Sequence, residues 1–342
     1  MSKIRLAVIG AGAIGRKHIA VIRANPRAEL VALADPSPQA QALAQSLGIA
    51  GYDNVETMLD AVQPQGVINA TPNILHLPCA LACIERGIPV LVEKPVADSP
   101  QRARELVDAA ARHQVPVLVG HHRRHNALIA AARTLIDSGE LGQIVTVSAH
   151  RVLQKPDDYF DVAWRREPGA GPLLVNLVHD IDLMRYLFGE IDQVQAFTSH
   201  AVRRFANEDS AVVNLRFASG ALGSAVLTDC GVGPWSWEMN SGENAIYAHA
   251  PENCYLISGT RGALAIPQMQ WWRYGEARGW LHPLLSDRLQ VEAIDPFMLQ
   301  LDHFLQVITG EEKPLIDAAD ALRSLEIVAA IQRAAGQAGQ ST

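Results

Sequence analysis

Cysteine is scarce in this sequence, whose 342 residues include only Cys79, Cys83, Cys230 and Cys254. So few thiols in a chain of this length exclude a disulfide framework. Cys79 and Cys83 would share a face of a helix, but small buried apolar residues are a better interpretation than a two-thiol metal or redox pair. We therefore expect a protein of a reducing compartment, by default the cytoplasm.

Long hydrophobic runs and an excess of positive charge are also missing. No apolar run approaches the ~20 residues of a membrane span. The glycines directly after Met1–Ile9 favour a first β-strand over a signal peptide. The net charge is −7. Since nucleic-acid and anionic membrane surfaces are bound by clustered Lys and Arg, we expect neither as a partner.

The remaining composition is that of a folded protein, with 49% hydrophobic and 19% charged residues, and the length suits two domains. Up to Gly120, short apolar runs alternate with helical stretches, which is typical of a parallel sheet covered on both faces. The expected strands are Ile4–Ile9, Leu30–Ala34, Gly66–Ala70, Pro89–Val92 and Val115–Val119, and the expected helices are Asn54–Ala61, His76–Arg86 and Pro100–His113.

Beyond Gly120, consecutive strand-like segments follow one another, which predicts an α+β domain with a large, mostly antiparallel open sheet. The predicted domains are 1–121, an α/β dinucleotide-binding (Rossmann) domain, and 122–342, a domain for substrate binding and oligomerisation. The expected elements are helices Ala127–Ser138, Leu173–Phe188 and Ala318–Ala335, and strands Ile144–His150, Ile191–Ser199, Ser210–Phe217 and Ala221–Thr228.

A glycine-rich turn, Gly10-Ala11-Gly12-Ala13-Ile14-Gly15, follows the first strand and opens a helix. In a GxGxxG turn the first glycine allows the tight turn, the second lets the backbone approach a pyrophosphate, and the third lets the helix pack closely. Asp35, at the end of the second strand, can accept hydrogen bonds from the ribose hydroxyls and would repel a 2′-phosphate, which favours NAD over NADP. The alternative is a plain glycine turn with a helix-capping Asp. The expected cofactor-binding residues here are Gly10, Gly12, Ala13, Ile14, Gly15 and Asp35.

Two further stretches are more specific: Ala70-Thr71-Pro72-Asn73-Ile74-Leu75-His76 and Val92-Glu93-Lys94-Pro95. With the glycine turn they resemble the Gfo/Idh/MocA family, the glucose–fructose oxidoreductase and inositol dehydrogenase group, over essentially the whole chain. The resemblance implies that Lys94 lies beside nicotinamide and substrate. Such a lysine can stabilise negative charge on the reacting oxygen, although a Lys before Pro is usually a surface residue. It also implies cofactor contacts for Thr71, Pro72, Asn73, His76, Glu93 and Lys94.

A second signature of the family is resembled by the glycine-rich turn Gly169–Pro172 and the helix that carries His179-Asp180-Ile181-Asp182. The resemblance implies that His179 is the catalytic histidine, which takes the hydroxyl proton. The sequence departs from the family at Val175, where many members carry Asp or Asn. Asn176 lies three residues before His179 and still shares its face. A core or capping role for His179 is the alternative, and of its neighbours Asp180 is expected to touch the site and Asp182 to be structural.

The expected substrate pocket draws on three segments. The family's Gly-x-x-x-Arg match in Gly120–Asn126 places Arg124 and His122 at the cleft; the His-rich sequence also suggests zinc, but no familiar ligand spacing accompanies it, so no metal is expected. The loop from Lys155 and the Trp-rich stretch Trp235–Glu238 offer aromatic faces for sugar or cyclitol rings, with core or subunit interface as the alternative for each Trp. The predicted substrate-binding residues are Arg124, His122, Asn176, Asp180, Tyr159, Trp164, Arg165 and Trp235.

These features predict an NAD-dependent dehydrogenase that oxidises a ring or secondary hydroxyl of a sugar, inositol or related polyol. One alternative is a dehydrogenase of another cyclic alcohol, such as a dihydrodiol. Another is a catalytically silent dinucleotide-binding regulatory protein, which Val175 weakly favours and the presence of both Lys94 and His179 disfavours. A homotetramer or homodimer is expected, because the second face of the C-terminal sheet needs a cover.

Overall fold

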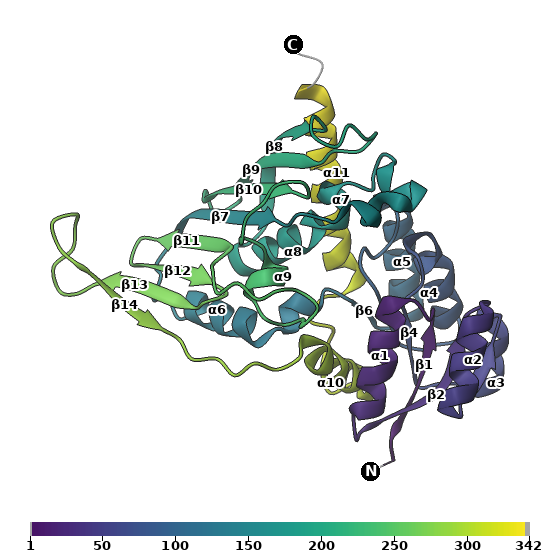
Figure 1. Ribbon diagram of the computed structural model, residues 1–342. Helices are drawn as coiled ribbons and strands as arrows, with labels where there is room; N and C mark the ends of the chain where they lie inside the picture. The colour runs from purple at the N-terminus through teal and green to yellow at the C-terminus, as the bar shows by residue number, and fades with distance from the viewer. Residues whose placement is uncertain (1, 339–342) are drawn as a thin grey trace. The chain divides into compact units, whose positions relative to one another are not determined.

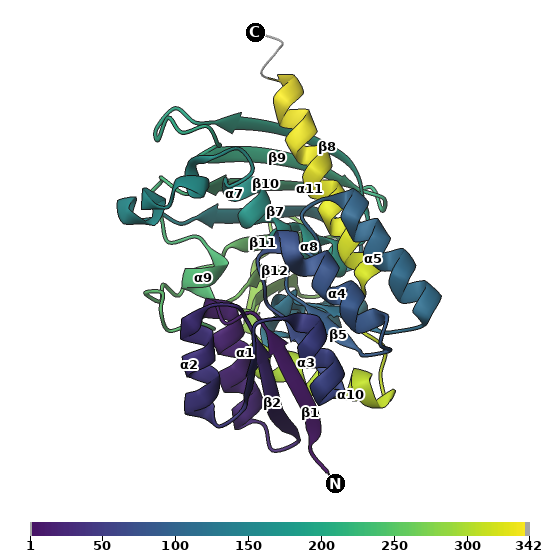
Figure 2. The same cartoon turned by 90° about the vertical axis from the view of Figure 1, so that its right-hand side faces the viewer.

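The computed structural model describes residues 2–338, and the chain divides into two compact units. The first comprises Met1–His125 and Asp295–Leu325, and the second comprises Asn126–Ile294 and Glu326–Thr342. Met1 and residues 339–342, which the predicted domains include, lie outside the described part of the chain. Figures 1 and 2 show the elements of both units, coloured along the chain.

The first unit is built on a six-stranded parallel sheet in the order β3-β2-β1-β4-β5-β6, which confirms the predicted α/β fold. Helices α2, α3 and α5 begin at residues whose side chains accept a first-turn N–H, namely Ser37, Asn54 and Ser99. The strands are β1 (Ile4–Ile9), β2 (Ala28–Ala34), β3 (Ala50–Tyr52), β4 (Gly66–Asn69), β5 (Val90–Val92) and β6 (Val117–Val119), and the helices are α1 (Ala13–Ala24), α2 (Pro38–Leu47), α3 (Val55–Val62), α4 (His76–Ile84) and α5 (Pro100–His113).

A late segment of the chain returns to this unit. Helix α10 (Pro296–Thr309) buries Leu301, Phe304 and Leu305, and Ile308 fills the space beside Gly66 of β4. Downstream, the Val119 N–H of β6 donates to the Ile316 carbonyl over 3.0 Å. The predicted limits placed residues 295–325 in the second domain; in the structure these apolar contacts join them to the first.

The second unit contains an eight-stranded sheet in the order β14-β13-β12-β11-β7-β10-β9-β8. Of the pairs described within this sheet, only β7 with β10 is parallel, so the predicted, mostly antiparallel sheet is confirmed. The strands are β7 (Ile144–Val152), β8 (Ile191–Ser199), β9 (Ser210–Phe217), β10 (Leu222–Thr228), β11 (Tyr255–Gly259), β12 (Gly262–Ile266), β13 (Gln270–Tyr274) and β14 (Leu284–Arg288).

One face of this sheet packs on helices and forms the core of the second unit. Core side chains come from the inward positions of the strands and from α6 (Ala127–Asp137), α8 (Leu177–Phe188) and the second half of α11 (Ala318–Ala338). The predicted single helix Leu173–Phe188 is two helices, because the backbone of Asn176 interrupts it between α7 (Pro172–Val175) and α8. The helix that carries His179 therefore starts after this break, at Leu177.

The opposite face of the sheet carries exposed apolar side chains. Phe197 of β8 pairs with Val212 of β9, and Val212 pairs with Val226 of β10, so the three share one face. Phe197 and Val212 are exposed, as are Leu222 and Leu256 on the same face. An exposed apolar surface of this kind is typical of a protein–protein contact.

A buried histidine links the first unit to its returning segment. His125 ends the short helix η2 (His122–His125), and its ring lies 5.2 Å from the ring of His303 in α10. Its Nε2 atom has no hydrogen-bond partner among residues 2–338. Burial lowers the pKa of His125 to about 3, and the neighbouring His303 and His122 add to this effect. The folded protein therefore holds this ring neutral.

We expect His125 to make the protein sensitive to mild acid. Because the folded-state pKa is lower than that of the unfolded chain, the unfolded state binds the proton first, and stability falls as the pH falls through the window from 6.5 to about 3. The loss between pH 6.5 and 5 should be about 2 kcal/mol. Urea unfolding at several pH values should show a shallower dependence for His125→Gln, whereas the exposed His113→Gln should behave as wild type. Equal slopes for wild type and His125→Gln would contradict this assignment.

Candidate functional site

The glycine turn after β1 has the three properties that a dinucleotide-binding turn needs. Gly10 has a φ of +92°, and a Cβ there would lie 2.6 Å from the Ala70 carbonyl oxygen. A Cβ on Gly15 would lie 2.0 Å from the Gly10 carbonyl oxygen, so the start of α1 packs directly on the turn. A Cβ on Gly12 would meet nothing within 4 Å. The first and third glycines are therefore required by packing, and the second leaves the backbone open to a ligand.

Asp35, directly after β2, is tied to this turn. Its carboxylate accepts the Ala11 N–H over 2.8 Å and the Ser37 N–H over 2.9 Å. Burial alone would raise the pKa of Asp35, but hydrogen bonds from Ser37 and Ala11 outweigh it and lower the pKa. The group is thus ionised at neutral pH, and each carboxylate oxygen keeps a lone pair for a ribose hydroxyl.

His76 joins the two loops that follow β4 and β5. It is buried, and its Nδ1 lies 2.7 Å from the Pro95 carbonyl oxygen while its Nε2 lies 2.9 Å from the Thr71 carbonyl oxygen. Asn69, at the end of β4, donates to the His76 carbonyl over 3.0 Å. The predicted cofactor contact of His76 stays a prediction; in the structure its ring supports the backbone of both loops. Pro72 and Asn73 lie in the exposed part of the first loop.

Glu93 lies beneath the lysine loop. Its Oε1 is 2.8 Å from His18 Nε2 of α1, and its Oε2 accepts the Lys94 N–H over 3.2 Å. A Cβ on Gly120 would lie 2.9 Å from this carboxylate, so only glycine fits there. Burial would raise the pKa of Glu93, but the hydrogen bond and charge of His18 outweigh it and lower the pKa. An ionised carboxylate therefore fixes the backbone of Lys94, whose own side chain is half-buried.

The residues of this edge fit a dinucleotide. The glycine turn, Asp35, Thr71–Asn73 and Glu93-Lys94 all follow the carboxyl ends of neighbouring parallel strands, where α/β sheets bind their ligands. Helix α1 begins at Gly12 without a side-chain cap, so its first turn presents backbone N–H groups to an anion. The turn that includes Ala13 and Ile14 would hold the pyrophosphate, and Asp35 the adenosine ribose.

Two residues predicted at the substrate are engaged within the first unit. Arg124 is buried and forms an ion pair with Asp320 of α11, with 2.6 Å between NH1 and Oδ2. The ring of His122 stacks on Phe297 of α10 with 4.6 Å between centroids. Both contacts connect η2 to the returning segment, and the substrate roles of Arg124 and His122 remain predictions.

In the second unit the residues around His179 lie in the first turns of α8. The His179 N–H donates to the Asn176 carbonyl over 3.1 Å, and His179 itself is buried. The Tyr255 hydroxyl of β11 donates to the Asp180 carboxylate. The Oδ1 atom of Asn176 is buried and has no hydrogen-bond partner within residues 2–338. An amide acceptor is thus available beside the histidine, at the point where the helix breaks.

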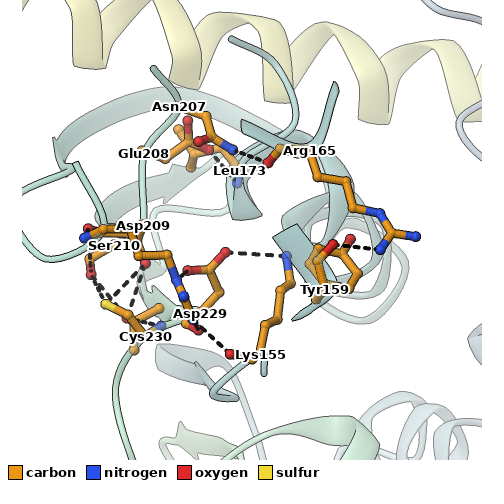
Figure 3. Close-up of polar contacts among 12 residues, drawn as sticks. Lys155, Tyr159, Arg165, Leu173, Asn207, Glu208, Asp209, Ser210, Asp229 and Cys230 are labelled. Carbon is orange, nitrogen blue, oxygen red and sulfur yellow. Dashed lines mark hydrogen bonds and ion pairs between the residues drawn. The ribbon is translucent and has the colours of Figure 1, made fainter. Parts of the chain in front are cut away.

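The turn before this helix is fixed by Glu208. Its carboxylate accepts the Leu173 N–H over 2.9 Å (Figure 3). A Cβ on Gly171 would lie 2.2 Å from the same carboxylate, so glycine is required at this position. Burial raises the pKa of Glu208. The start of α7, and with it the approach to Asn176, is therefore set by a residue that precedes β9.

The loop after β7 is held by charged contacts of its own. Asp229 forms two ion pairs. Its Oδ2 lies 3.3 Å from Lys155 Nζ, and its Oδ1 lies 3.1 Å from Arg203 Nε. Figure 3 shows Lys155 directed at Asp229. The Arg165 guanidinium lies over the Tyr159 ring at 4.1 Å and donates to the Tyr159 carbonyl over 2.7 Å. Tyr159 and Arg165, both predicted at the substrate, thus stabilise each other in the loop.

The two tryptophans predicted at the substrate both present exposed surface. Trp164 lies in the short helix η4 (Ala163–Arg166) and is 56% exposed, and Trp235 is 44% exposed. In contrast, Trp237 of the same Trp-rich stretch is buried and packs edge-on against Tyr255 with 6.4 Å between centroids. Trp164 and Trp235 are therefore available to a ring-shaped ligand, and Trp237 belongs to the core.

Sequence reasoning missed His18 and Glu208, which support these sites, and the buried Arg151 of β7. Arg151 had a visible sign, because it follows Val147 and Ala149 at alternate, core-facing positions of one strand. A charge at a core-facing position of an alternating pattern indicates a functional or paired residue. His18 and Glu208 show no comparable sign, because their partners lie far away in the sequence.

Other kinds of site find little support within residues 2–338. No three His, Cys, Asp or Glu side chains converge there in a way that would hold a metal ion. None of the helices in that range combines the length and the hydrophobicity needed to cross a bilayer. The four cysteines are free thiols.

Two family models cover most of the chain. Residues 4–121 match the model of the oxidoreductase family with an NAD-binding Rossmann fold. Residues 129–265 match the model of the GFO/IDH/MocA C-terminal domain. The two matches fall on the parallel sheet and on the first part of the second unit.

Individual relatives agree with these matches. The chain is 32% identical to inositol 2-dehydrogenase 4 of Saccharopolyspora erythraea over 244 residues, 68% of this chain and 69% of that one. It is 31% identical to the rhizopine catabolism protein MocA of Rhizobium meliloti over 191 residues, 56% of this chain and only 59% of that one. The chain is also similar to the solved structure of the WlbA dehydrogenase of Bordetella pertussis in complex with NADH and UDP-GlcNAcA, with 26% sequence identity and a TM-score of 0.77. The superposition covers 98% of this chain and 97% of that one.

Alanine substitutions in the glycine turn should separate packing from ligand approach. Gly12→Ala should change the free energy of unfolding by no more than about 0.5 kcal/mol, because the added methyl meets nothing. It should nevertheless weaken NADH binding at least tenfold. Gly15→Ala should destabilise the protein by about 1–3 kcal/mol or more and lose NADH as a result. Fluorescence titration with NADH measures the affinity of both variants, and urea unfolding measures their stability. Wild-type NADH affinity in Gly12→Ala would show that the cofactor does not approach the backbone at Gly12.

Proposed function

The chain belongs to the Gfo/Idh/MocA family of oxidoreductases, and we propose that it is an NAD-dependent dehydrogenase acting on a ring or secondary hydroxyl of a sugar, inositol or related polyol. The observation that carries the proposal is the arrangement of the parallel sheet's carboxyl edge. There the glycine turn, the ionised Asp35 and the Glu93-Lys94 loop follow adjacent strands. The names of relatives, an inositol 2-dehydrogenase among them, support the substrate class.

NAD is the proposed cofactor, and it supplies the hydride acceptor when bound. Asp35 would hold the ribose hydroxyls, and its lowered pKa keeps a negative charge where NADP would bring its phosphate. The glycine turn would hold the pyrophosphate. Thr71 and Lys94, at the ends of the next two strands, would face the nicotinamide end of the cofactor. Wild-type kcat/KM should accordingly be higher with NAD than with NADP.

His179 is the proposed acid/base residue, and Lys94 the residue that polarises the reacting oxygen. A neutral imidazole at His179 would accept the hydroxyl proton during oxidation. The ammonium of Lys94 would donate a hydrogen bond to the same oxygen and stabilise its developing negative charge. The buried side-chain oxygen Oδ1 of Asn176 can accept a hydrogen bond from a substrate hydroxyl. Asn176 would thus bind the substrate without acting as a base. Arg124 would add a further hydroxyl contact.

Substitution of Lys94 and His179 tests the proposal. Oxidation of a panel of inositols, hexoses and cyclic diols by NAD should produce NADH, followed by absorbance. His179→Ala should lower kcat by roughly 10²–10⁴-fold, and Lys94→Ala should also lower kcat, since both act in the transition state. NADH binding should survive in both variants, and the exposed His113→Gln should keep wild-type kcat.

Each departure from this pattern has its own meaning. If His179→Ala keeps near-wild-type kcat while Lys94→Ala is inactive, Lys94 is the base and the assignment of His179 is wrong. If both variants keep their activity, the catalytic site is misplaced. If wild-type protein binds NADH but oxidises no member of the panel, the proposed substrate class fails.

A homotetramer or homodimer is also part of this proposal, supported by the exposed apolar face of the second sheet. Phe197 and Val212, adjacent on that face, are 66% and 43% exposed. Burying them between copies would remove apolar surface from water. Light scattering at micromolar concentration should give a multiple of the chain mass, and Val212→Glu should reduce it. A monomer mass for wild type would contradict the proposal.

A further inference from the structure

Arg151 lies at the carboxyl end of β7, on the face of the sheet that carries the core. The alternation of β7 places it on the same face as Ala149, about 7 Å along the strand. It is 5% exposed, which is unusual for an arginine. Tyr255 is the cross-strand partner of Ala149, and its hydroxyl donates to Asp180, the neighbour of His179. Arg151 thus lies one inward position beyond Ala149, whose cross-strand partner Tyr255 contacts the histidine helix.

The guanidinium of Arg151 is only partly satisfied. Its NH2 donates to Glu238 Oε1 over 3.0 Å. Its Nε and NH1 atoms are buried and have no hydrogen-bond partner among residues 2–338. A buried donor without an acceptor costs about 1–3 kcal/mol, and more when it is charged. Glu238 binds only one of the three guanidinium nitrogens, and the other two indicate a ligand that supplies their acceptors.

A second cation lies near the first. The side chain of Lys155 is only 10% exposed, and its ammonium forms an ion pair with Asp229 over 3.3 Å. Asp229 is shared, because Arg203 binds the other carboxylate oxygen over 3.1 Å. Lys155 Nζ is buried and, beyond its ion pair with Asp229, makes no hydrogen bond within residues 2–338. Burial lowers the pKa of Lys155, Asp229 opposes this, and the charge of Arg151 lowers it further. Like Arg151, Lys155 therefore has donors that an anion could accept from.

We propose that Arg151, with Lys155, binds an acidic substituent of the substrate, a carboxylate or a phosphate, so that the preferred substrates are sugar acids or sugar phosphates rather than neutral polyols. This inference rests on the proposed dehydrogenase function and narrows it. The Nε and NH1 donors of Arg151 need acceptors. Carboxylate and phosphate oxygens only accept, whereas a hydroxyl also donates. The planar guanidinium is suited to both anions.

Matched sugars test the subsite on the complete protein with NADH bound. D-glucose is compared with D-glucuronate and D-glucose 6-phosphate, and D-galactose with D-galacturonate and D-galactose 6-phosphate. Calorimetry measures Kd, and turnover with NAD measures kcat/KM. An acidic member should bind about 10- to 100-fold more tightly than its neutral parent, as hydrogen bonds to a charged group imply. Whether the uronates or the phosphates gain more identifies the anion.

Variants assign the effect to the side chain. Arg151→Gln should remove most of the preference for the acid. Arg86→Gln, which removes an exposed arginine paired with Asp60 in the first unit, should keep it. If Arg151→Gln does not fold because Glu238 is left unpaired, the double variant Arg151→Gln/Glu238→Gln removes the ion pair as a whole. If neither variant folds, the comparison of each acidic sugar with its neutral parent on the wild-type protein still tests the subsite.

The outcomes separate the subsite from the dehydrogenase. Arg151-dependent binding of an acid, with no NADH formed from any sugar, keeps the subsite and overturns the proposed function. Turnover of neutral sugars with no gain for their acids keeps the function and overturns the subsite. Equal weakening of neutral and acidic ligands by Arg151→Gln would make the arginine structural and also overturn it, as would the absence of binding by every acid.

Discussion

The contact between Glu93 and His18 underlies the geometry of the lysine loop. A carboxylate removed from water is tolerated only when its oxygens are bound. Here one oxygen meets His18 of α1 and the other meets the Lys94 N–H. Gly120 leaves the room that the carboxylate occupies. The position of the Lys94 backbone thus depends on α1, which supplies His18, and on the end of β6, which Gly120 follows, and not on the lysine loop alone.

The second unit uses the same principle with different partners. Glu208 fixes the start of α7 through Leu173, and Tyr255 fixes the first turn of the histidine helix α8 through Asp180. In each unit, a carboxylate holds backbone close to the predicted catalytic residue: Glu93 at Lys94 itself and Glu208 at the turn before Asn176. This is how a fold holds a reactive side chain on rigid supports while leaving its chemistry to a ligand.

The fold and the cofactor edge could be predicted because their determinants are local. The glycine turn, Asp35 and the strand–helix alternation are each readable within a short window of sequence, and the parallel sheet follows from them. The break at Asn176 was missed because no Pro or Gly marks it and the helical pattern continues through it. The return of α10 to the first unit was missed because an amphipathic helix does not state which core it covers.

Pairs between distant residues were the hardest to predict. Arg151 and Glu238 lie 87 positions apart, and His18 and Glu93 lie 75 apart. Their association depends on which strands become neighbours, which no local pattern encodes. The predicted substrate contacts of Tyr159 and Arg165 came from the polar and aromatic composition of their loop and from its position in the family resemblance. Neither shows that the two residues bind each other.

The hydrogen bond from the Ala11 N–H to Asp35 restricts how this protein could change its cofactor during evolution. The carboxylate that we propose distinguishes NAD from NADP also holds the turn on which either cofactor would lie. A single replacement by an apolar residue would relax discrimination and release the turn together, so the intermediate would bind either cofactor poorly. A change of cofactor could instead begin with a basic residue beside Asp35, or with Asn or Ser in place of Asp35. Asn and Ser keep an acceptor for the Ala11 N–H. Cofactor preference in this chain is therefore a property of the loop's anchorage as much as of its charge.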